Sequence, residues 1–313
     1  MTLEQDVKRA FDVSKKLVVE TGMKALEIRS KHMRVAEGRC ETIGQIRDIS
    51  TEADWRSLKK MLKTFINMGM HKRFRIHVEE EDARFCWAQP LIGKFTSNAK
   101  YRLTIDPIDG TANYASKTPS GIRMVKKLSE RVNDIEKHLV PNSWGPMIGL
   151  EENGTAYFGT IFQPSQKKLF YAMRGNGAFI EYDVGRKTEL KIDKRARFKM
   201  GNIIYTNSDG LEKFLKFARS GLNVRHHGSY AYTAMRIAEG HAECIVAKEP
   251  KLHDVIPPMC ILREAGGIVV DERGKDAIAG KSKYFIFAPN IIYVNALLKT
   301  LKTRGDKVLE LEF

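Results

Sequence analysis

Hydrophobic residues recur at helical spacing in two stretches near the N-terminus. The first covers residues 3–31, where charged residues separate the apolar ones. The second begins at about Glu52 and ends at Gly69, since glycine commonly follows the last turn of a helix. Its apolar stripe consists of Trp55, Leu58, Leu62, Phe65 and Ile66. The pattern predicts two amphipathic helices, each with one buried face.

Short apolar runs follow, and several of them end in acidic or turn residues. Residues 74–82 and 101–111 are expected to be strands that end in carboxylates. From Gly145 onward, apolar segments are separated by the turn signals Asn153-Gly154, Pro164-Ser165 and Gly175-Asn176-Gly177. This region predicts a meander of strands.

The second half of the chain alternates between short apolar strands and helices. The expected strands cover residues 202–208, 242–248, 266–271 and 284–289, and the expected helices cover 210–220, 229–240, 254–265 and 290–302. This alternation predicts a layered α/β fold. A soft boundary near residues 185–200 divides the chain into halves of residues 1–190 and 191–313, which we expect to form one compact catalytic unit.

Residues 122–140 stand out as an extra segment. Their apolar positions have near-helical spacing and many charges lie between them, so they predict an amphipathic helix inserted before the meander. The helix could cover a site, contact a longer substrate, form an oligomer interface or be only a surface insertion.

The 313 residues are 42% hydrophobic and 29% charged, which is ordinary for a globular protein. The N-terminus carries no apolar signal segment, and the longest apolar stretch is too short to cross a membrane. The four cysteines lack the spacing of a zinc site and indicate free thiols in a reducing compartment. We therefore expect a soluble cytoplasmic protein.

The net charge of +15 is unusually high. Its densest basic run, residues 185–199, resembles an exposed hairpin strand and has no interleaved aromatic residue before Phe198. A solvated basic face is the simplest interpretation. Attraction of an anionic substrate or of nucleic acid is the alternative.

Several carboxylates stand where strands or helices are expected to end: Asp54, Glu79, Glu80, Asp106, Asp109 and Asp254. Clustered carboxylates repel unless cations neutralise them, and oxygen ligands suit Mg²⁺ or Mn²⁺ better than Zn²⁺. Taken singly, each acid has a plainer explanation. Asp109 is typical of a turn and Asp54 of the first turn of a helix, while Asp254 reads as an N-cap with two prolines in the first turn behind it.

The segment Asp-Pro-Ile-Asp-Gly-Thr-Ala-Asn-Tyr at residues 106–114 closely resembles the signature of the inositol monophosphatase family. That family belongs to the lithium-sensitive, magnesium-dependent phosphatases, with fructose-1,6-bisphosphatases. Other segments also resemble family segments, in the same order along the chain, at residues 48–57, 76–82, 159–180, 228–248 and 253–271. The resemblance implies an αβαβα sandwich and a phosphatase that uses two or three Mg²⁺ ions, for which Mn²⁺ can substitute.

The resemblance also implies roles for individual residues. The expected ligands of the first metal are Glu79, Asp106 and the Ile108 carbonyl, and those of the second are Asp106, Asp109 and Asp254. A third, weaker ion is expected near Glu79. Backbone amides of Gly110, Thr111 and Ala112 are expected to contact phosphate, while Asp54 and Thr111 are expected to polarise the attacking water. Glu249 lies near the place where family members contact substrate hydroxyls.

This chain departs from the family pattern at a few positions. Val78 replaces the glycine before the acidic pair, so Glu80 is an alternative ligand to Glu79. His253 replaces the usual tryptophan before Asp254 and could pack, donate a hydrogen bond to a carboxylate or contact substrate. The adjacent pair His226-His227 is typical of a surface or turn.

The sequence therefore predicts a phosphomonoesterase for a small polyol or sugar phosphate, with inositol monophosphate first and fructose-1,6-bisphosphate second. A 3′,5′-bisphosphate nucleotidase is an alternative within the same fold. A basic protein that associates with nucleic acid and has lost turnover is the non-enzymatic alternative. By resemblance we also expect a homodimer and inhibition by lithium, and we expect no membrane partner.

Overall fold

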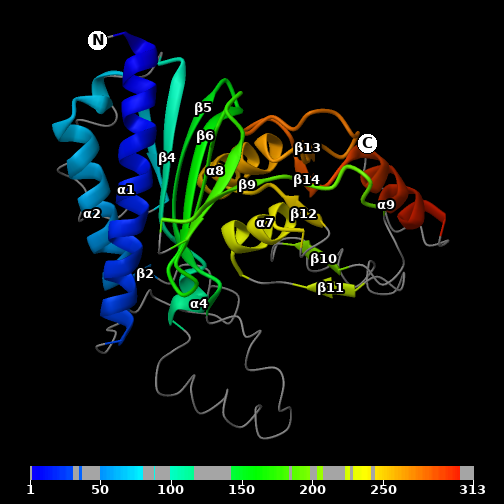
Figure 1. Cartoon of the computed structure of the whole chain (residues 1–313), viewed down its shortest axis with the longest axis horizontal. Coiled ribbons are helices and arrows are strands. Elements are labelled where there is room, and N and C mark those ends of the chain that lie inside the picture. The colour runs from blue at the N-terminus through cyan, green and yellow to red at the C-terminus, as the bar shows by residue number, and fades with distance from the viewer. Residues whose placement is uncertain are drawn as a thin grey trace, which may run out of the picture.

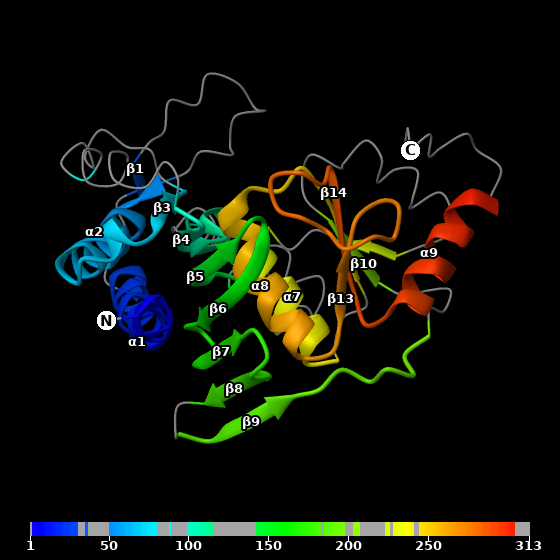
Figure 2. The same cartoon turned by 90° about the horizontal axis from the view of Figure 1, so that it is seen from above.

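The structure is a computed structural model and describes residues 2–30, 35–36, 50–79, 88, 99–115, 142–182, 185–197, 203–206, 223–225, 228–240 and 244–303. Its elements form five layers, seen edge-on in Figure 2: two helices, a large sheet, two helices, a smaller sheet and a last helix. The αβαβα sandwich expected from the sequence is confirmed.

The first layer consists of α1 (Leu3–Ser30) and α2 (Glu52–Asn67). Both helices lie where the hydrophobic spacing predicts them. Their apolar faces pack on the outer face of the large sheet in one core that includes Leu58, Leu62 and Phe65. Two short elements adjoin α2, namely the strand pair β1 (Val35–Ala36) and β2 (Ser50–Thr51), and the 3₁₀ turn η2 (Met70–Lys72).

The large sheet has seven strands in the order β3-β4-β5-β6-β7-β8-β9. They are β3 (Arg75–Val78), β4 (Tyr101–Asp109), β5 (Gly145–Glu152), β6 (Thr155–Gln163), β7 (Lys168–Met173), β8 (Ala178–Tyr182) and β9 (Lys187–Leu190). Strands β4 to β9 are antiparallel neighbours, as a meander requires, and β3 is parallel to β4. Within residues 185–197, the described part of the basic run, only the four residues of β9 form a strand.

Two helices, α7 (Tyr230–Ala238) and α8 (Leu252–Glu264), fill the space between the sheets. Helix α8 lies against β5 and β6 (Figure 1), and glycines permit the close approach. A Cβ atom on Gly159 would lie 2.2 Å from the Pro257 carbonyl oxygen, and one on Gly149 would lie 2.8 Å from the Ile256 side chain. The position of α8 therefore depends on the missing side chains of both strands.

The smaller sheet has five strands in the order β11-β10-β12-β14-β13. They are β10 (Ile203–Thr206), β11 (Asn223–Arg225), β12 (Cys244–Lys248), β13 (Ile268–Val270) and β14 (Tyr284–Ala288). Strand β10 is parallel to β11 and β12, whereas β14 is antiparallel to β12 and β13. Helix α9 (Ile291–Thr303) covers the outer face, where Tyr293, Val294 and Leu297 are buried.

One prediction about α8 is wrong. The helix begins at Leu252 with Lys251 as its N-cap, so Asp254 lies within the first turn and does not cap it. Pro257 and Pro258 consequently lie inside the helix rather than in its first turn. A proline inside a helix lacks the N–H that would pair with the preceding turn. Here the helix is buried between two sheets, and this packing outweighs the local preference.

Three further points concern predicted elements that the structure does not describe, a strand that the sequence does not predict, and the boundary between the halves. The helices expected at 122–140 and 210–220 lie outside the described residues. Strand β11 was not expected, because three residues carry too weak a periodicity. The division into halves at about residue 190 stays a prediction, although the larger sheet ends at Leu190 and the smaller one begins at Ile203.

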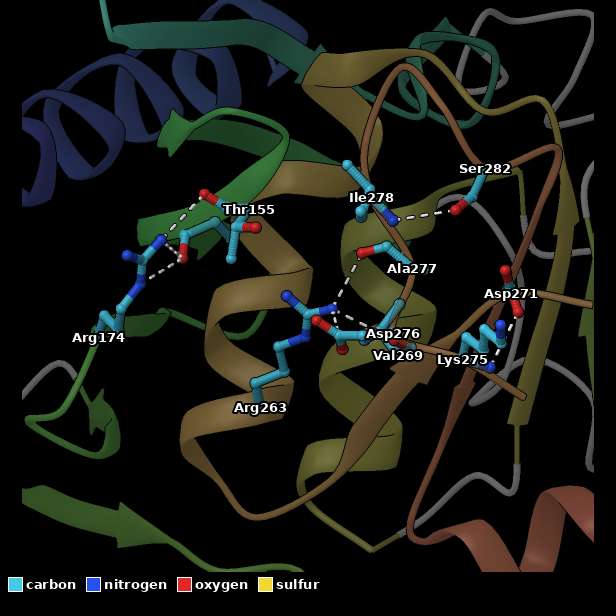
Figure 3. Close-up of polar contacts among 11 residues, drawn as sticks. Thr155, Arg174, Arg263, Val269, Asp271, Lys275, Asp276, Ala277, Ile278 and Ser282 are labelled. Atoms are coloured by element: carbon cyan, nitrogen blue, oxygen red, sulfur yellow. Dashed lines mark hydrogen bonds and ion pairs between the residues drawn. The ribbon is translucent and has the colours of Figure 1, made fainter. Parts of the chain in front are cut away.

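Two arginines, one of them in α8, donate hydrogen bonds to backbone carbonyls of neighbouring segments (Figure 3). Arg263 donates to the carbonyls of Val269 and Ala277 and pairs with Asp276 at 2.7 Å. Arg174 donates to the carbonyls of Thr155 and Ala156 at the start of β6. Arg174 and Arg263 therefore contribute to the large positive charge and also bind backbone carbonyls.

Two further observations bear on the sequence-based expectations. Cys244 and Cys260 are buried thiols. Among the residues that the structure describes, no helix has the length and apolar character needed to span a membrane.

Candidate metal centre

A bulge in β4 brings two aspartates to the same face. Asp106 lies opposite Met147 and Asp109 lies opposite Gly145, so three steps along β4 match two steps along β5. In a regular strand, residues three apart point to opposite faces. The extra residue reverses that alternation, and one oxygen of each carboxylate lies within 4.8 Å of the other. The segment Asp-Pro-Ile-Asp therefore forms a bulge at the end of β4.

Gly110 turns the chain sharply after the bulge. Its φ of 80° is the left-handed conformation that favours glycine, and an added Cβ would lie 2.7 Å from the Ser143 carbonyl oxygen. The short helix α4 (Thr111–Ala115) begins directly after it. The Thr111 hydroxyl therefore faces back toward β4, where it lies 2.8 Å from the Ile108 carbonyl oxygen.

Asp54 reaches the same place from α2. Thr51 and Asp54 form a capping box, in which the Thr51 amide donates to Asp54 Oδ2 at 2.8 Å and the Thr51 hydroxyl donates to the same oxygen. The other oxygen, Oδ1, lies 3.1 Å from the Thr111 hydroxyl. The plain explanation of Asp54 as a first-turn acid is correct, and the residue also contacts Thr111.

Asp109 is held by the beginning of α7, which no pattern in the sequence had linked to it. The Ser229 hydroxyl donates to Asp109 Oδ2, and the amides of Tyr230 and Ala231 donate at 3.2 and 2.8 Å. Ser229 is also the N-cap of α7. The partnership spans 120 residues of sequence, so only the approach of the two layers reveals it.

Two groups of side chains have donor atoms close enough to share a cation. Asp106, Asp109 and Asp254 form one group, and Glu79, Asp106 and His253 form the other. Within each group the donor atoms lie within 4.8 Å of one another. Asp106 belongs to both groups, so its carboxylate is the link between two adjoining positions.

Burial makes this cluster costly when no cation is bound. It raises the pKa of Glu79 to about 7 and the pKa values of Asp54 and Asp109 to about 6, although hydrogen bonds from Thr51 and Ser229 oppose the rise. Burial and the neighbouring carboxylates raise the pKa values of Asp106 and Asp254 well above the ordinary range. Each shift reports that the negative charge is poorly solvated.

Unpartnered atoms show where a cation fits. Among the described residues, Asp106 Oδ2 and Glu79 Oε2 are buried and have no hydrogen-bond partner. Buried carboxylate oxygens are normally paired or bound to metal. Oxygen donors in this arrangement suit Mg²⁺. The residues present therefore fit the divalent cations that the sequence predicts.

The structure does not bring every candidate residue to the cluster. Glu249 follows β12, is exposed and lies outside both groups, with a left-handed φ of 45°. Glu80 and the pair His226-His227 lie outside the described residues. His253, for which packing was one of three interpretations, lies beside Glu79 and Asp254 at 3.9 and 3.8 Å from its Nε2.

Comparisons with known proteins agree with this geometry. The family model for the inositol monophosphatase family matches residues 8–306. A fructose-1,6-bisphosphatase/inositol-1-monophosphatase of Thermotoga maritima is 28% identical over 60% of this chain and 63% of its own length. A histidinol-phosphatase of Mycobacterium tuberculosis is 24% identical over 56% of this chain and 60% of its own. The match thus spans less than two thirds of these two relatives.

A solved structure has the same fold over nearly the full length. An IMPase/NADP phosphatase complexed with Mg²⁺ and phosphate superposes with a TM-score of 0.66, covering 97% of this chain and 98% of that one, at 18% identity. At that identity the likeness shows the fold alone. Together with the family match, it leaves one assignment: the chain belongs to the inositol monophosphatase family, whose members are metal-dependent phosphatases.

Proposed function

We propose that this protein hydrolyses the phosphate monoester of a small polyol or sugar, with inositol monophosphate as the first candidate and fructose-1,6-bisphosphate as the second. The observation that carries the proposal is Asp106, which is buried, has an oxygen without a hydrogen-bond partner among the described residues and belongs to both groups of potential ligands. Two adjoining cation positions that share a carboxylate are the arrangement used for in-line displacement at phosphorus.

The residues divide between two Mg²⁺ positions. Glu79, Asp106 and the Ile108 carbonyl would hold one ion, and Asp106, Asp109 and Asp254 would hold the other. A third, weaker ion would lie near Glu79, and Mn²⁺ would substitute for Mg²⁺. When bound, the ions supply Lewis-acid stabilisation of phosphoryl and leaving-group oxygens and lower the pKa of water.

The chain's own groups orient the reactants. Backbone amides of Gly110, Thr111 and Ala112 would donate to the phosphate oxygens. Thr111 has a single hydroxyl proton for two acceptors, Asp54 Oδ1 and the Ile108 carbonyl. Its lone pairs are therefore available to accept a hydrogen bond from the attacking water. Asp54 would then polarise that water through Thr111, with its own position fixed by the capping box of α2.

The substrate's hydroxyl groups require contacts outside the metal centre. Glu249 would supply one of them, because its exposed carboxylate follows β12 and its backbone adopts a conformation uncommon for a non-glycine residue. The relatives act on different phosphate esters by name, so the substrate must be found by direct comparison.

The experiment is phosphate release from inositol-1-phosphate, fructose-1,6-bisphosphate, histidinol phosphate and adenosine 3′,5′-bisphosphate, each with Mg²⁺ and with Mn²⁺. Asp106→Asn serves as the blank. Turnover of one ester that the variant abolishes supports the proposal and identifies the substrate class. Failure of the folded protein on all four would contradict the polyol or sugar phosphate assignment. Steeply salt-dependent RNA binding by that inactive protein would favour the non-enzymatic role.

A further inference from the structure

His253 has an unusual environment for a buried histidine. It is the second residue of α8 and is 2% exposed. In the part of the chain that the structure describes, neither its Nδ1 nor its Nε2 atom has a hydrogen-bond partner. Burying an imidazole without a partner costs free energy, so such an arrangement calls for an explanation.

The distances around Nε2 exclude a hydrogen bond and allow shared ligation. Nε2 lies 3.9 Å from Glu79 Oε1 and 3.8 Å from Asp254 Oδ1, and hydrogen bonds of this kind are shorter than about 3.2 Å. Two donors that each lie about 2.1 Å from one metal ion can be up to about 4.2 Å apart. The separation between His253 and Glu79 therefore fits an ion lying between them.

A second ring holds the imidazole in place. His77 of β3 stacks on His253, with ring centroids 5.6 Å apart and planes inclined by 19°. The stacking leaves the edge of the His253 ring directed at the carboxylates of Glu79 and Asp254. An imidazole whose orientation is already fixed loses little freedom when it binds a metal.

We propose that His253 is a metal ligand, so that the Glu79–Asp106–His253 group takes a first-row transition-metal dication in preference to Mg²⁺. The inference rests on the proposed metal phosphatase site and specifies one of its two positions. Carboxylates alone suit Mg²⁺, whereas an added imidazole nitrogen favours Mn²⁺, Co²⁺ or Zn²⁺. The all-oxygen group Asp106, Asp109 and Asp254 remains suited to Mg²⁺, so the two positions differ in preference.

Metal binding to the full-length, metal-free protein tests this without relying on turnover. Calorimetric titrations with Mg²⁺ and with Co²⁺ give the two affinities, and pulsed EPR of bound Mn²⁺ detects a coordinated ¹⁴N nucleus. The variants are His253→Phe, which keeps an aromatic ring but no donor atom, and His77→Phe, which keeps the stacking and removes the other imidazole.

We expect His253→Phe to weaken Co²⁺ binding by about 10–100-fold. Mg²⁺ binding should change by less than about threefold, because oxygen ligands dominate it. The wild-type Mn²⁺ spectrum should contain ¹⁴N coupling that persists in His77→Phe. Equal losses in both variants would indicate an effect of the ring pair and would overturn the assignment of His253 as ligand.

The EPR spectrum of Mn²⁺ bound to the wild-type protein tests the inference even if His253→Phe does not fold. Metal binding without ¹⁴N coupling would overturn this inference and leave the proposed phosphatase site intact. Absence of binding by Mg²⁺, Mn²⁺ and Co²⁺ to the folded wild-type protein would overturn both. Phosphate release is not needed for any of these outcomes.

Discussion

Asp106 combines a stability cost with a proposed role as metal ligand. Its carboxylate is buried next to Glu79, Asp109 and Asp254, which together with burial keep its pKa well above the usual range. One oxygen accepts from the Ile108 amide at 2.9 Å and the other has no partner among the described residues. Without a cation the carboxyl group is therefore favoured in its protonated form, and a bound cation would stabilise the ionised form.

Replacing the Asp106 carboxylate by an amide should separate its effect on stability from its effect on activity. Asp106→Asn is expected to lower kcat/KM by at least about 100-fold, because both cation positions lose a ligand. It should also stabilise the metal-free protein by about 1–3 kcal/mol, because Asn is neutral without binding a proton, which the buried Asp106 must do, and Asn retains the acceptor for Ile108. Urea unfolding in EDTA measures the second effect. Lower stability of the metal-free variant would contradict the account.

Glu151→Gln is the matched control. Glu151 is a buried carboxylate of β5 that pairs with Arg102 at 3.1 Å and accepts from the Gly154 amide. It lies outside both groups of potential ligands. The same chemical change should therefore lower stability and leave activity unchanged.

At the level of elements, the contact between α8 and the large sheet positions Asp254. Gly159→Ala would place a Cβ 2.2 Å from the Pro257 carbonyl oxygen, so α8 must shift. Overpacking of this kind is expected to cost about 1–3 kcal/mol. Because Asp254 lies on the same helix, the variant should also bind the second cation more weakly, which calorimetry would measure.

Gly175→Ala distinguishes displacement of α8 from a general effect of the substitution. A Cβ there meets no atom within 4 Å, and only the left-handed φ of 78° is unfavourable. That strain is worth about 1–2 kcal/mol. Metal binding should remain at the wild-type level. Weakened binding in Gly175→Ala would show that global destabilisation, not the position of α8, explains the loss.

The beginning of α7 offers a second test at this scale. Ser229→Ala removes an N-cap, which should cost about 1 kcal/mol of stability, together with the hydroxyl that donates to Asp109. The amides of Tyr230 and Ala231 remain, so Asp109 keeps its place but is less firmly oriented. We expect a reduced kcat as well as the stability loss, measured by steady-state kinetics and urea unfolding.

Ser14→Ala controls for the loss of a buried hydroxyl. Ser14 donates to the Ala10 carbonyl within α1, and it contacts neither Asp109 nor the start of α7 in any hydrogen bond of the described residues. Its removal should leave kcat unchanged. Activity lost equally in both serine variants would contradict the proposed orientation of Asp109 by Ser229.

For the whole molecule, the proposed cation site brings together acids from different layers. Glu79 follows β3, Asp106 and Asp109 lie in β4, and Asp254 lies in α8. Without a cation, the folded protein holds protons on acids whose pKa values are raised, such as Glu79 at about 7. The unfolded chain releases those protons near pH 4. Stability of the metal-free protein therefore falls as the pH rises through the folded-state values.

The test compares unfolding in EDTA at about pH 6.5 and about pH 8, a range that begins at the ordinary histidine pKa. Burial lowers the pKa of His253 to about 3, so most of the stability that His253 adds as the pH rises is already present at the start of that range. We expect a loss of about 1–3 kcal/mol. Mg²⁺ at about 100 times its Kd should restore about 2.7 kcal/mol at the higher pH. A flat profile in EDTA would contradict the raised pKa values.

The sequence by itself determined most elements and the chemistry of the candidate ligands. Helical spacing predicts α1 and α2, the alternation of strands and helices predicts α9, and turn residues such as Asn153-Gly154 mark the ends of the meander strands. These signals are local, because they depend on side-chain periodicity and backbone conformation within a few residues. The expected cluster of Glu79, Asp106, Asp109 and Asp254 also lies together in the structure. Their roles, the homodimer, lithium inhibition and the cytoplasmic location remain predictions.

Tertiary structure alone decided how those residues meet. The support of Asp109 by Ser229 and the approach of His253 to Glu79 join segments far apart in sequence. No local periodicity encodes such contacts, because they depend on how closely two layers approach. That distance is set by residues such as Gly159, whose missing side chain lets α8 touch the sheet. The sequence predicts the candidate ligands, and the packing of the layers determines which groups contact them.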